Sequence, residues 1–421
     1  MGQPVVDAFR PVLGIAVLLA LAWAFSENRR GVRLRPVLGG VALQFALAML
    51  LLWFPPARRA MLSVNDAAEA LSHATNAGTR FVFGYLAGPP LPFTETSPGG
   101  AFILAFQALP LVLTISALAT LLFHWGVLQA VMRGFAWVLR RMLGVGGALA
   151  LGAAVHVFVG MVEAPLLVRP WLARMQRGEL FALMTCGMAG IAGTVMVIYA
   201  TILGPVIPDA LGNILSAALI STPAAIAVAA LMIPFDPGRE DEARLVLPDP
   251  PADSLDAVVK GTAQGIPILA SIVAVLLVTV ALVTLTNMLL GLLPAVGGEA
   301  VTLQRLFALP FRPVVWLIGV PWEQAGVAAG LMATKTALNE FVAYLNLAAL
   351  PADTLSLHSR FILTFALCGF ANFGSVGIMV GGIAAMIPER RDEVAKLGLR
   401  SLVSGTIATC TSGAVAGLLL G

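Results

Sequence analysis

Long apolar stretches recur along the whole chain, and they constrain the fold more than any other feature. Most are about 18 to 25 residues long, so at ~1.5 Å per residue each could cross ~30 Å of hydrocarbon. Of the 421 residues, 59% are hydrophobic and only 11% are charged, which is too little charge to cover a water-soluble domain. We therefore expect an all-α polytopic membrane protein without a separate soluble domain.

Hydropathy predicts about eight transmembrane helices. The first stretch has no basic region before it and no small-residue cleavage site after it, so we expect a retained span rather than a cleaved signal peptide. The predicted spans are 4–25, 36–54, 101–131, 180–205, 208–233, 262–293, 361–387 and 397–420.

Charge and cysteine content argue against two other classes of protein. The formal net charge is only +3, and the basic residues stand in short loops, so nucleic acid is not an expected partner. Cys186, Cys368 and Cys410 lie in apolar segments, where thiols behave as small hydrophobic groups. Their odd number argues against a disulfide framework. We expect no metal site and no cofactor.

Three further segments are predicted not to cross the membrane. Residues 57–78 carry apolar side chains at helical spacing beside polar ones, which is typical of an amphipathic helix at the membrane interface. Segments 143–168 and 321–349 are interrupted by Gly or Pro and contain carboxylates expected to be buried, which indicates two re-entrant hairpins. The apolar positions of the amphipathic segment are Met61, Val64, Ala68 and Leu71.

Clusters of Arg and Lys set the predicted orientation, because they favour cytoplasmic loops. If the N-terminus is outside and both hairpins are re-entrant, the four main clusters face the cytoplasm, while four other arginines face outside. The first hairpin then enters from the cytoplasm and the second from outside, as an inverted repeat requires. The clusters are 29–35, 133–141, 169–177 and 390–400, and the exceptions are Arg58, Arg59, Arg305 and Arg312.

A short motif follows each predicted hairpin. Cys186-Gly187-Met188-Ala189 and Cys368-Gly369-Phe370-Ala371 share Cys-Gly-x-Ala and are 368 − 186 = 182 positions apart. Small residues there would let a helix break, although such runs also mark close helix contacts in any membrane bundle. Opposed hairpins beside broken helices are the construction with which transporters bind a polar solute near the bilayer midplane. The sequence therefore predicts a transporter.

Three segments resemble signature sequences of the concentrative nucleoside transporters: Gly160-Met161-Val162-Glu163-Ala164-Pro165-Leu166, Asn339-Glu340-Phe341-Val342-Ala343-Tyr344 and Ala366-Leu367-Cys368-Gly369-Phe370-Ala371-Asn372. The resemblance covers nearly the whole chain, including an acidic loop from Asp236 to Asp256. It implies a secondary active importer of nucleosides in the bacterial inner membrane, working by alternating access as a homotrimer surrounded by lipid. It implies no enzymatic activity.

The resemblance also implies a scaffold and a mobile transport domain. The scaffold would comprise residues 1–131, with the interfacial helix, and residues 208–293, with a cytoplasmic loop at 235–260. Residues 143–205 and 321–387, each a hairpin followed by a broken helix, would form the transport domain. Residues 397–420 would form the final span.

The resemblance further implies that a nucleoside lies between the two hairpins. A carboxylate, an amide and a hydroxyl supply the hydrogen bonds that the ribose hydroxyls need, and an unpaired buried polar group costs ~1 to 3 kcal/mol. From the residues alone, Phe370 could equally fill a helix interface. The expected nucleobase-side residues are Gly160, Met161, Val162, Glu163 and Val195, and the expected ribose-side residues are Glu340, Phe370, Asn372 and Ser375.

The chain departs from the family pattern at two places. Met161 and Val162 stand where the family has Gln and Thr or Ser, so we expect recognition of the base to be less polar, or directed at another base or a modified nucleoside. His156 and Gly190 replace an Asn and a Ser whose side chains bind sodium in the family. Because sodium prefers oxygen ligands, these positions form a degenerate sodium site, and protons are predicted as the coupling ion.

Three residues are candidate carriers of the coupling proton. An unpaired carboxylate at bilayer depth costs about 2.5 to 3.5 kcal/mol on insertion scales, so Glu163 and Glu340 are expected to have a use. His156 is the third candidate, because histidine ordinarily titrates near pH 6.5, although a histidine that only hydrogen-bonds the backbone is commoner. Lys335 could pair with Glu340, but a spacing of five residues is imperfect for contact on a helix.

Other functions remain as alternatives. A membrane-embedded enzyme could also use His and Glu, but the chain has no His-Glu-x-x-His, no Gly-x-Ser-x-Gly and no Gly-rich phosphate loop. A sodium-coupled importer, a channel, or a carrier of the same fold for a modified nucleoside would share these motifs. Export is equally compatible with them, because an alternating-access carrier runs in either direction according to the gradients.

Overall fold

The computed structural model describes residues 3–94, 101–236 and 249–420. Those residues are mostly helical and form no strand, which confirms the predicted all-α class. The helices of the first part are α1 (Gln3–Ala24), α2 (Leu34–Trp53), α3 (Pro55–Phe83), α4 (Leu104–Gln107), α5 (Leu111–His124) and α6 (Val127–Leu143), with short 3-10 turns at Arg29–Gly31 and Gly84–Ala87.

The rest of the described chain contains thirteen further α-helices. The middle part comprises α7 (Gly147–His156), α8 (Glu163–Leu167), α9 (Arg169–Leu172), α10 (Arg177–Ala189), α11 (Gly193–Leu203), α12 (Ala210–Met232) and α13 (Ser254–Leu290). The last part comprises α14 (Leu303–Leu317), α15 (Trp322–Ala337), α16 (Glu340–Ala349), α17 (Leu357–Leu367), α18 (Phe373–Met386) and α19 (Arg391–Leu419), with a 3-10 turn at Pro388–Arg390.

Six helical segments of the described chain are long and apolar enough to cross a membrane. Two of the eight predicted spans are not among them. Of α1, only Phe9–Ala24 has described side chains, and that stretch is shorter than a membrane span, while the predicted span 361–387 is divided into α17 and α18. The six segments are Leu34–Trp53, Leu104–His124, Arg177–Leu203, Ala210–Met232, Ser254–Leu290 and Pro388–Leu419.

The structure corrects two boundaries. The predicted span 101–131 is not one helix, because Gly126 adopts a left-handed conformation with a φ of 79° and separates α5 from α6. The predicted loop 235–260 is wrong at its end, since the Asp253 side chain accepts a hydrogen bond from the Asp256 backbone N–H and starts α13 at Ser254. Residues 237–248 of that loop lie outside the described residues.

Helix α14 was not predicted from the sequence. Its N-terminus is capped by Thr302, whose hydroxyl oxygen accepts a hydrogen bond from the Arg305 backbone N–H. The helix contains Pro310 and Pro313. Proline disfavours a helix interior, so two of them within one segment hide the helix from a reading of the sequence.

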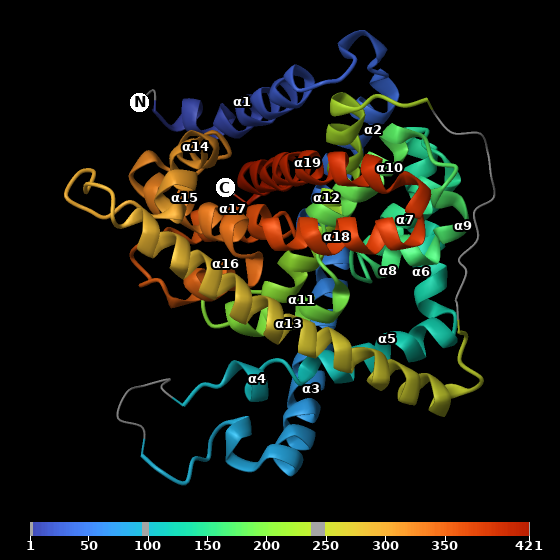
Figure 1. Cartoon of the computed structure of the whole chain (residues 1–421), viewed down its shortest axis with the longest axis vertical. Coiled ribbons are helices and arrows are strands. Elements are labelled where there is room, and N and C mark those ends of the chain that lie inside the picture. Colours follow the sequence, from blue (N-terminus) through green and yellow to red (C-terminus); the bar gives the residue numbers. More distant parts are fainter. Residues whose placement is uncertain (1–2, 95–100, 237–248, 421) are drawn as a thin grey trace.

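The two predicted hairpins lie at opposite ends of the helix bundle. Figure 1 shows α7 and α8 close to α9 and α10 at one end, and α15 and α16 close to α14 and α17 at the other, while α18 and α19 extend between the two groups. Helix α3 projects away from the bundle and buries only Thr79 among its described side chains. The position of α3 outside the bundle agrees with the predicted amphipathic helix, while re-entry of the two hairpins into a membrane stays a prediction.

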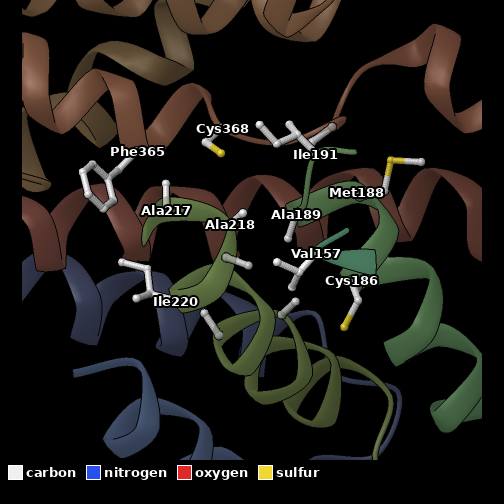
Figure 2. Close-up of a cluster of buried hydrophobic side chains, with 14 of the residues drawn as sticks. Val157, Cys186, Met188, Ala189, Ile191, Ala217, Ala218, Ile220, Phe365 and Cys368 are labelled. Carbon is white, nitrogen blue, oxygen red and sulfur yellow. The ribbon is translucent and has the colours of Figure 1, made fainter. Parts of the chain in front are cut away.

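The core lies where the two broken helices pack against α12, which carries small residues at the contact. Most of α12 is buried, and it packs against α2, α10 and α19. Figure 2 shows Ile191 of the first break and Cys368 of the second near Ala217 and Ala218 of α12. Small side chains let these backbones approach closely, as is usual between membrane helices. Cys186, Cys368 and Cys410 are all buried free thiols.

Two of the predicted cytoplasmic clusters of basic residues, 169–177 and 390–400, meet at one end of the bundle. Glu27, just after α1, accepts hydrogen bonds from Arg177 at 3.0 Å and from Arg400 at 2.6 Å. Arg390 pairs with Glu393 at 2.7 Å and donates to backbone carbonyls near the end of α9. Three segments far apart in the sequence are thereby held together on the side that the first hairpin occupies.

Replacing Glu27 with Gln should destabilise the protein by about 1 kcal/mol at neutral pH, because Arg177 and Arg400 lose their shared carboxylate. The hydrogen bond from Arg177 holds the pKa of Glu27 below its ordinary value of 4.5. A lowered pKa stabilises the fold above the ordinary value, and this contribution is lost as the pH falls through the lowered pKa. Thermal unfolding in detergent should therefore show a difference between E27Q and wild type near pH 7 that shrinks near pH 4.

The matched control is Glu389→Gln, since Glu389 is exposed in the adjacent 3-10 turn and is not part of the Glu27 cluster. It should leave the stability unchanged at both pH values. Equal losses in E27Q and E389Q, or a loss in E27Q that does not depend on pH, would contradict the assignment.

Candidate functional site

The two helix breaks that the sequence predicted are joined directly. Helix α10 ends at Ala189 and α11 begins at Gly193, while α17 ends at Leu367 and α18 begins at Phe373. The backbone N–H of Phe370, in the second break, donates to the carbonyl of Gly190, in the first, at 3.1 Å. Polar groups that each helix leaves unpaired at its break are thus partly satisfied by the other break.

A glycine makes this approach possible. A Cβ at Gly369 would lie 2.9 Å from the carbonyl oxygen of Met188 and 3.0 Å from that of Ala189. Backbone atoms cannot give way as a flexible side chain can, so only glycine fits beside the end of α10. The glycine of the second Cys-Gly-x-Ala motif therefore has a packing role at the junction of the repeats.

The expected ribose-side residues converge on the carboxylate of Glu340. Its Oε2 accepts a hydrogen bond from Asn372 Nδ2 at 3.1 Å, and Asn372 Oδ1 caps α18 by accepting from the Ser375 backbone N–H at 2.7 Å. All three residues are buried. Glu340 also opens α16, so its negative charge lies beside the N-termini of two helices, which favours it. Phe370 contributes its backbone to the junction, and its side chain is half-buried.

Tyr199 belongs to this cluster, although reading the sequence missed it. Its hydroxyl donates to Glu340 Oε1 at 2.7 Å, and the residue is buried in α11. Its ring lies 5.8 Å from that of Phe341 and 5.2 Å from that of Tyr344. One signal in the sequence could have pointed to Tyr199: it is a tyrosine in an otherwise apolar segment, and a buried Tyr hydroxyl usually has a hydrogen-bond partner. Which partner it would find could not be read from the sequence.

Lys335 makes different contacts from those considered in the sequence. Its side chain is fully buried, and Nζ donates to the carbonyl of Ala366 at 2.9 Å and to Thr409 Oγ1 at 3.1 Å. The ammonium therefore caps the carboxyl end of α17, where the last carbonyls of a helix carry partial negative charge. It supports the second break rather than forming a hydrogen bond with Glu340.

Four of the expected nucleobase-side residues, 160–163, form the tip of the first hairpin, and the fifth, Val195, lies on α11. Backbone N–H of Gly193 donates to the carbonyl of Phe158 at 3.2 Å, which ties this tip to the first break. Val162 faces α18, because a Cβ at Gly382 would lie 2.8 Å from its Cγ1. Met161 and Val195 are buried as well.

Glu163 differs from Glu340 in its surroundings. Glu163 is exposed and is the first residue of the short helix α8. One of its carboxylate oxygens lies next to Gly160, three residues earlier in the chain. The expectation that the carboxylates of both hairpins are buried is therefore wrong for Glu163. The physical reason is that Glu163 opens α8 at the hairpin tip, where the neighbouring Gly160 has no side chain to cover it.

The two positions expected to form a degenerate sodium site, His156 and Gly190, lie close together. A Cβ at Gly190 would lie 3.8 Å from the carbonyl oxygen of His156. His156 is buried, and its Nε2 has no hydrogen-bond partner in the described part of the protein. This nitrogen therefore makes no backbone hydrogen bond of the kind that a purely structural histidine would make.

Comparisons with known proteins agree with this architecture. Residues 13–86 and 213–417 match the families described as Na+ dependent nucleoside transporter N-terminus and C-terminus, and residues 105–206 match the family described as nucleoside recognition.

Similar proteins cover almost the full length of the chain. An uncharacterized transporter of Haemophilus influenzae is 37% identical, with 97% of each chain covered. A putative nucleoside permease, NupX, of Escherichia coli is 34% identical, with 99% of each covered. A solved structure of CNTnw in an inward-facing substrate-bound state is 35% identical with a TM-score of 0.87, covering 98% of this chain and 99% of that one. The chain therefore belongs to the concentrative nucleoside transporter family, and it is a membrane transporter rather than an enzyme.

Proposed function

We propose that this protein imports nucleosides together with protons, by alternating access at a site between the two hairpins. The observation that carries the proposal is the buried cluster of Glu340, Asn372 and Ser375, which lies where the second hairpin meets the second helix break. Such a cluster of acceptors and donors inside an apolar bundle favours a polar solute as its ligand.

The chemistry of the cluster suits a ribose. A carboxylate can accept about four hydrogen bonds, and the hydroxyl of Tyr199 and the amide of Asn372 account for two at Glu340. The remaining lone pairs can accept from the vicinal hydroxyls of a sugar. Phe370, next to Asn372, offers an apolar face for the sugar or base.

The base side is less polar than the ribose side. Met161 and Val162 contribute no hydrogen-bonding side chains, and Val162 packs toward α18. Glu163, with Gly160 beside it, is the polar group left to contact the base. We infer that shape and one carboxylate select the base, which permits another base or a modified nucleoside.

Protons are the coupling ion in this proposal, although the family descriptions name sodium. Sodium favours oxygen ligands, and His156 and Gly190 provide no side-chain oxygen at the matching positions. Glu163, Glu340 and His156 are the groups proposed to carry the proton.

The membrane placement and assembly are also proposed. The N-terminus would lie outside the bacterial inner membrane, and the end of the bundle containing Glu27 would face the cytoplasm. Helix α13 is the most apolar of the six candidate spans, and only 6% of its apolar window is buried. It packs against α5, and its remaining surface is available to lipid and to neighbouring subunits of a homotrimer. In this arrangement α3, α5 and α13 belong to the scaffold, and the hairpins with their broken helices move.

Replacing Glu340 with Gln should abolish uridine and adenosine uptake into proteoliposomes while leaving the oligomer intact on size-exclusion chromatography. The substitution replaces the carboxylate that accepts hydrogen bonds from Tyr199, Asn372 and the sugar with an uncharged amide that has only one acceptor oxygen. The matched control is Glu323→Gln at the other end of the same hairpin, where Glu323 is exposed. It should retain uptake, and wild-type uptake in E340Q would refute the ribose site.

An imposed proton gradient alone should drive accumulation by the wild-type protein, and a sodium gradient of equal size should not. The double substitution His156→Asn and Gly190→Ser restores two side-chain oxygens at the first break, so sodium should then stimulate uptake several-fold. A sodium requirement in the wild type would contradict proton coupling. Lack of accumulation of either nucleoside under both gradients would refute transport of these two substrates.

A further inference from the structure

We propose that Tyr199 is a positioning residue that fixes the carboxylate of Glu340 and thereby sets the selectivity for the ribose hydroxyls. The inference rests on the proposed function, because it concerns the same ribose site. Its basis is the 2.7 Å hydrogen bond from the Tyr199 hydroxyl to Glu340 Oε1, formed between two residues that are 2% and 4% exposed.

The hydroxyl of Tyr199 is held in place by its surroundings. Its ring packs against Phe341 and Tyr344 at centroid distances of 5.8 and 5.2 Å. Those two residues follow Glu340 on α16, whereas Tyr199 belongs to α11 of the first repeat. The contact therefore joins the first repeat to the carboxylate of the second repeat, and the aromatic packing prevents the phenol from moving away.

Tyr199 and Asn372 together fix the plane of the carboxylate. The last torsion of a glutamate side chain is broad, so an isolated carboxylate can turn easily. Here Oε1 is held by Tyr199 and Oε2 by Asn372, so the remaining lone pairs point in fixed directions. A sugar that lacks one hydroxyl leaves a buried acceptor unpaired, and a carboxylate that cannot turn has no other way to satisfy it.

The carboxylate of the first hairpin lacks this arrangement. Glu163 is exposed over Gly160, and α18 presents Gly382 to the neighbouring Val162. Of the two hairpin carboxylates, only that of Glu340 is held at both oxygens, and Glu340 is on the side proposed to bind the sugar. This asymmetry supports a role in selecting the sugar rather than a general role in closing hairpins.

The test compares Tyr199→Phe with Tyr344→Phe in proteoliposomes. Tyr344 is a close control, because it is fully buried, lies against Tyr199, and donates its hydroxyl to the backbone carbonyl of Thr364 at 2.8 Å instead of to Glu340. KM and Vmax are measured for uridine, 2′-deoxyuridine and 3′-deoxyuridine under one gradient. A ratio of KM values is independent of the amount of folded protein, so partial misfolding does not obscure it.

In Y199F the KM for uridine should rise about tenfold, as expected on loss of a hydrogen bond to a charged group. The KM values for the deoxynucleosides should rise less, so that discrimination between uridine and its deoxy analogues falls. Y344F should keep the wild-type discrimination. If Y199F does not give folded protein, 3-fluorotyrosine at position 199 keeps the shape and donates a stronger hydrogen bond, and discrimination should then increase.

Unchanged discrimination in Y199F, or the same loss in Y344F, would overturn the inference and show that Tyr199 only fills space. If the wild type transports uridine and E340Q does not, such a result leaves the proposed function standing and removes only the role of Tyr199. Absence of nucleoside transport by the wild type would overturn both.

Discussion

The hydrogen bond between the backbone of Phe370 and the carbonyl of Gly190 is the contact on which the rest of the site depends. Breaking a helix inside an apolar bundle leaves backbone donors and acceptors without water, and each unpaired group costs several kcal/mol in hydrocarbon. Two breaks that face each other lower this cost, because a backbone N–H of one can donate to a backbone carbonyl of the other. Their meeting point is also where polar side chains can enter the bundle, since the local backbone is already polar.

Burying Glu340 is the second constraint, because an unpaired carboxylate is strongly destabilising in a low dielectric. The protein compensates with the hydroxyl of Tyr199, the amide of Asn372 and the N-termini of α16 and α18. The buried ammonium of Lys335 directs its hydrogen bonds to α17 and α19 instead. These groups come from α11 and from the second helix break as well as from the second hairpin, so the cluster around Glu340 forms only when both halves of the chain are folded.

The sequence was sufficient for the class of fold and for the outline of the site. Composition and apolar periodicity predict the helices, and the small residues at 186–193 and 368–375 indicate breaks or close packing, which the structure resolves as breaks at 190–192 and 368–372. The match of Glu340, Asn372 and Ser375 to family motifs predicts a cluster that the structure brings together. Hydropathy misplaced two helix boundaries. A left-handed glycine ends a helix near Gly126, and a capping aspartate starts one at Ser254, although the surrounding sequence is no less apolar or polar there.

The partners of the buried charges could not be predicted, because they depend on tertiary packing. Tyr199 and Glu340 are 141 positions apart, and Lys335 and Thr409 are 74 apart. No periodicity or motif links such pairs. Helix α14 was missed because its two prolines argue locally against a helix. In the folded protein, packing against α15 stabilises this helix.

The proposed change of coupling ion is compatible with an intact cluster around Glu340. His156 and Gly190 belong to the first hairpin and first break, whereas the hydrogen bonds at Glu340 involve the second hairpin, the second break and α11. The two regions meet through backbone atoms of Gly190 and Phe370, which do not depend on side-chain identity. Side chains that bind a cation can therefore be replaced at the first break while the junction, and the carboxylate beyond it, keep their geometry.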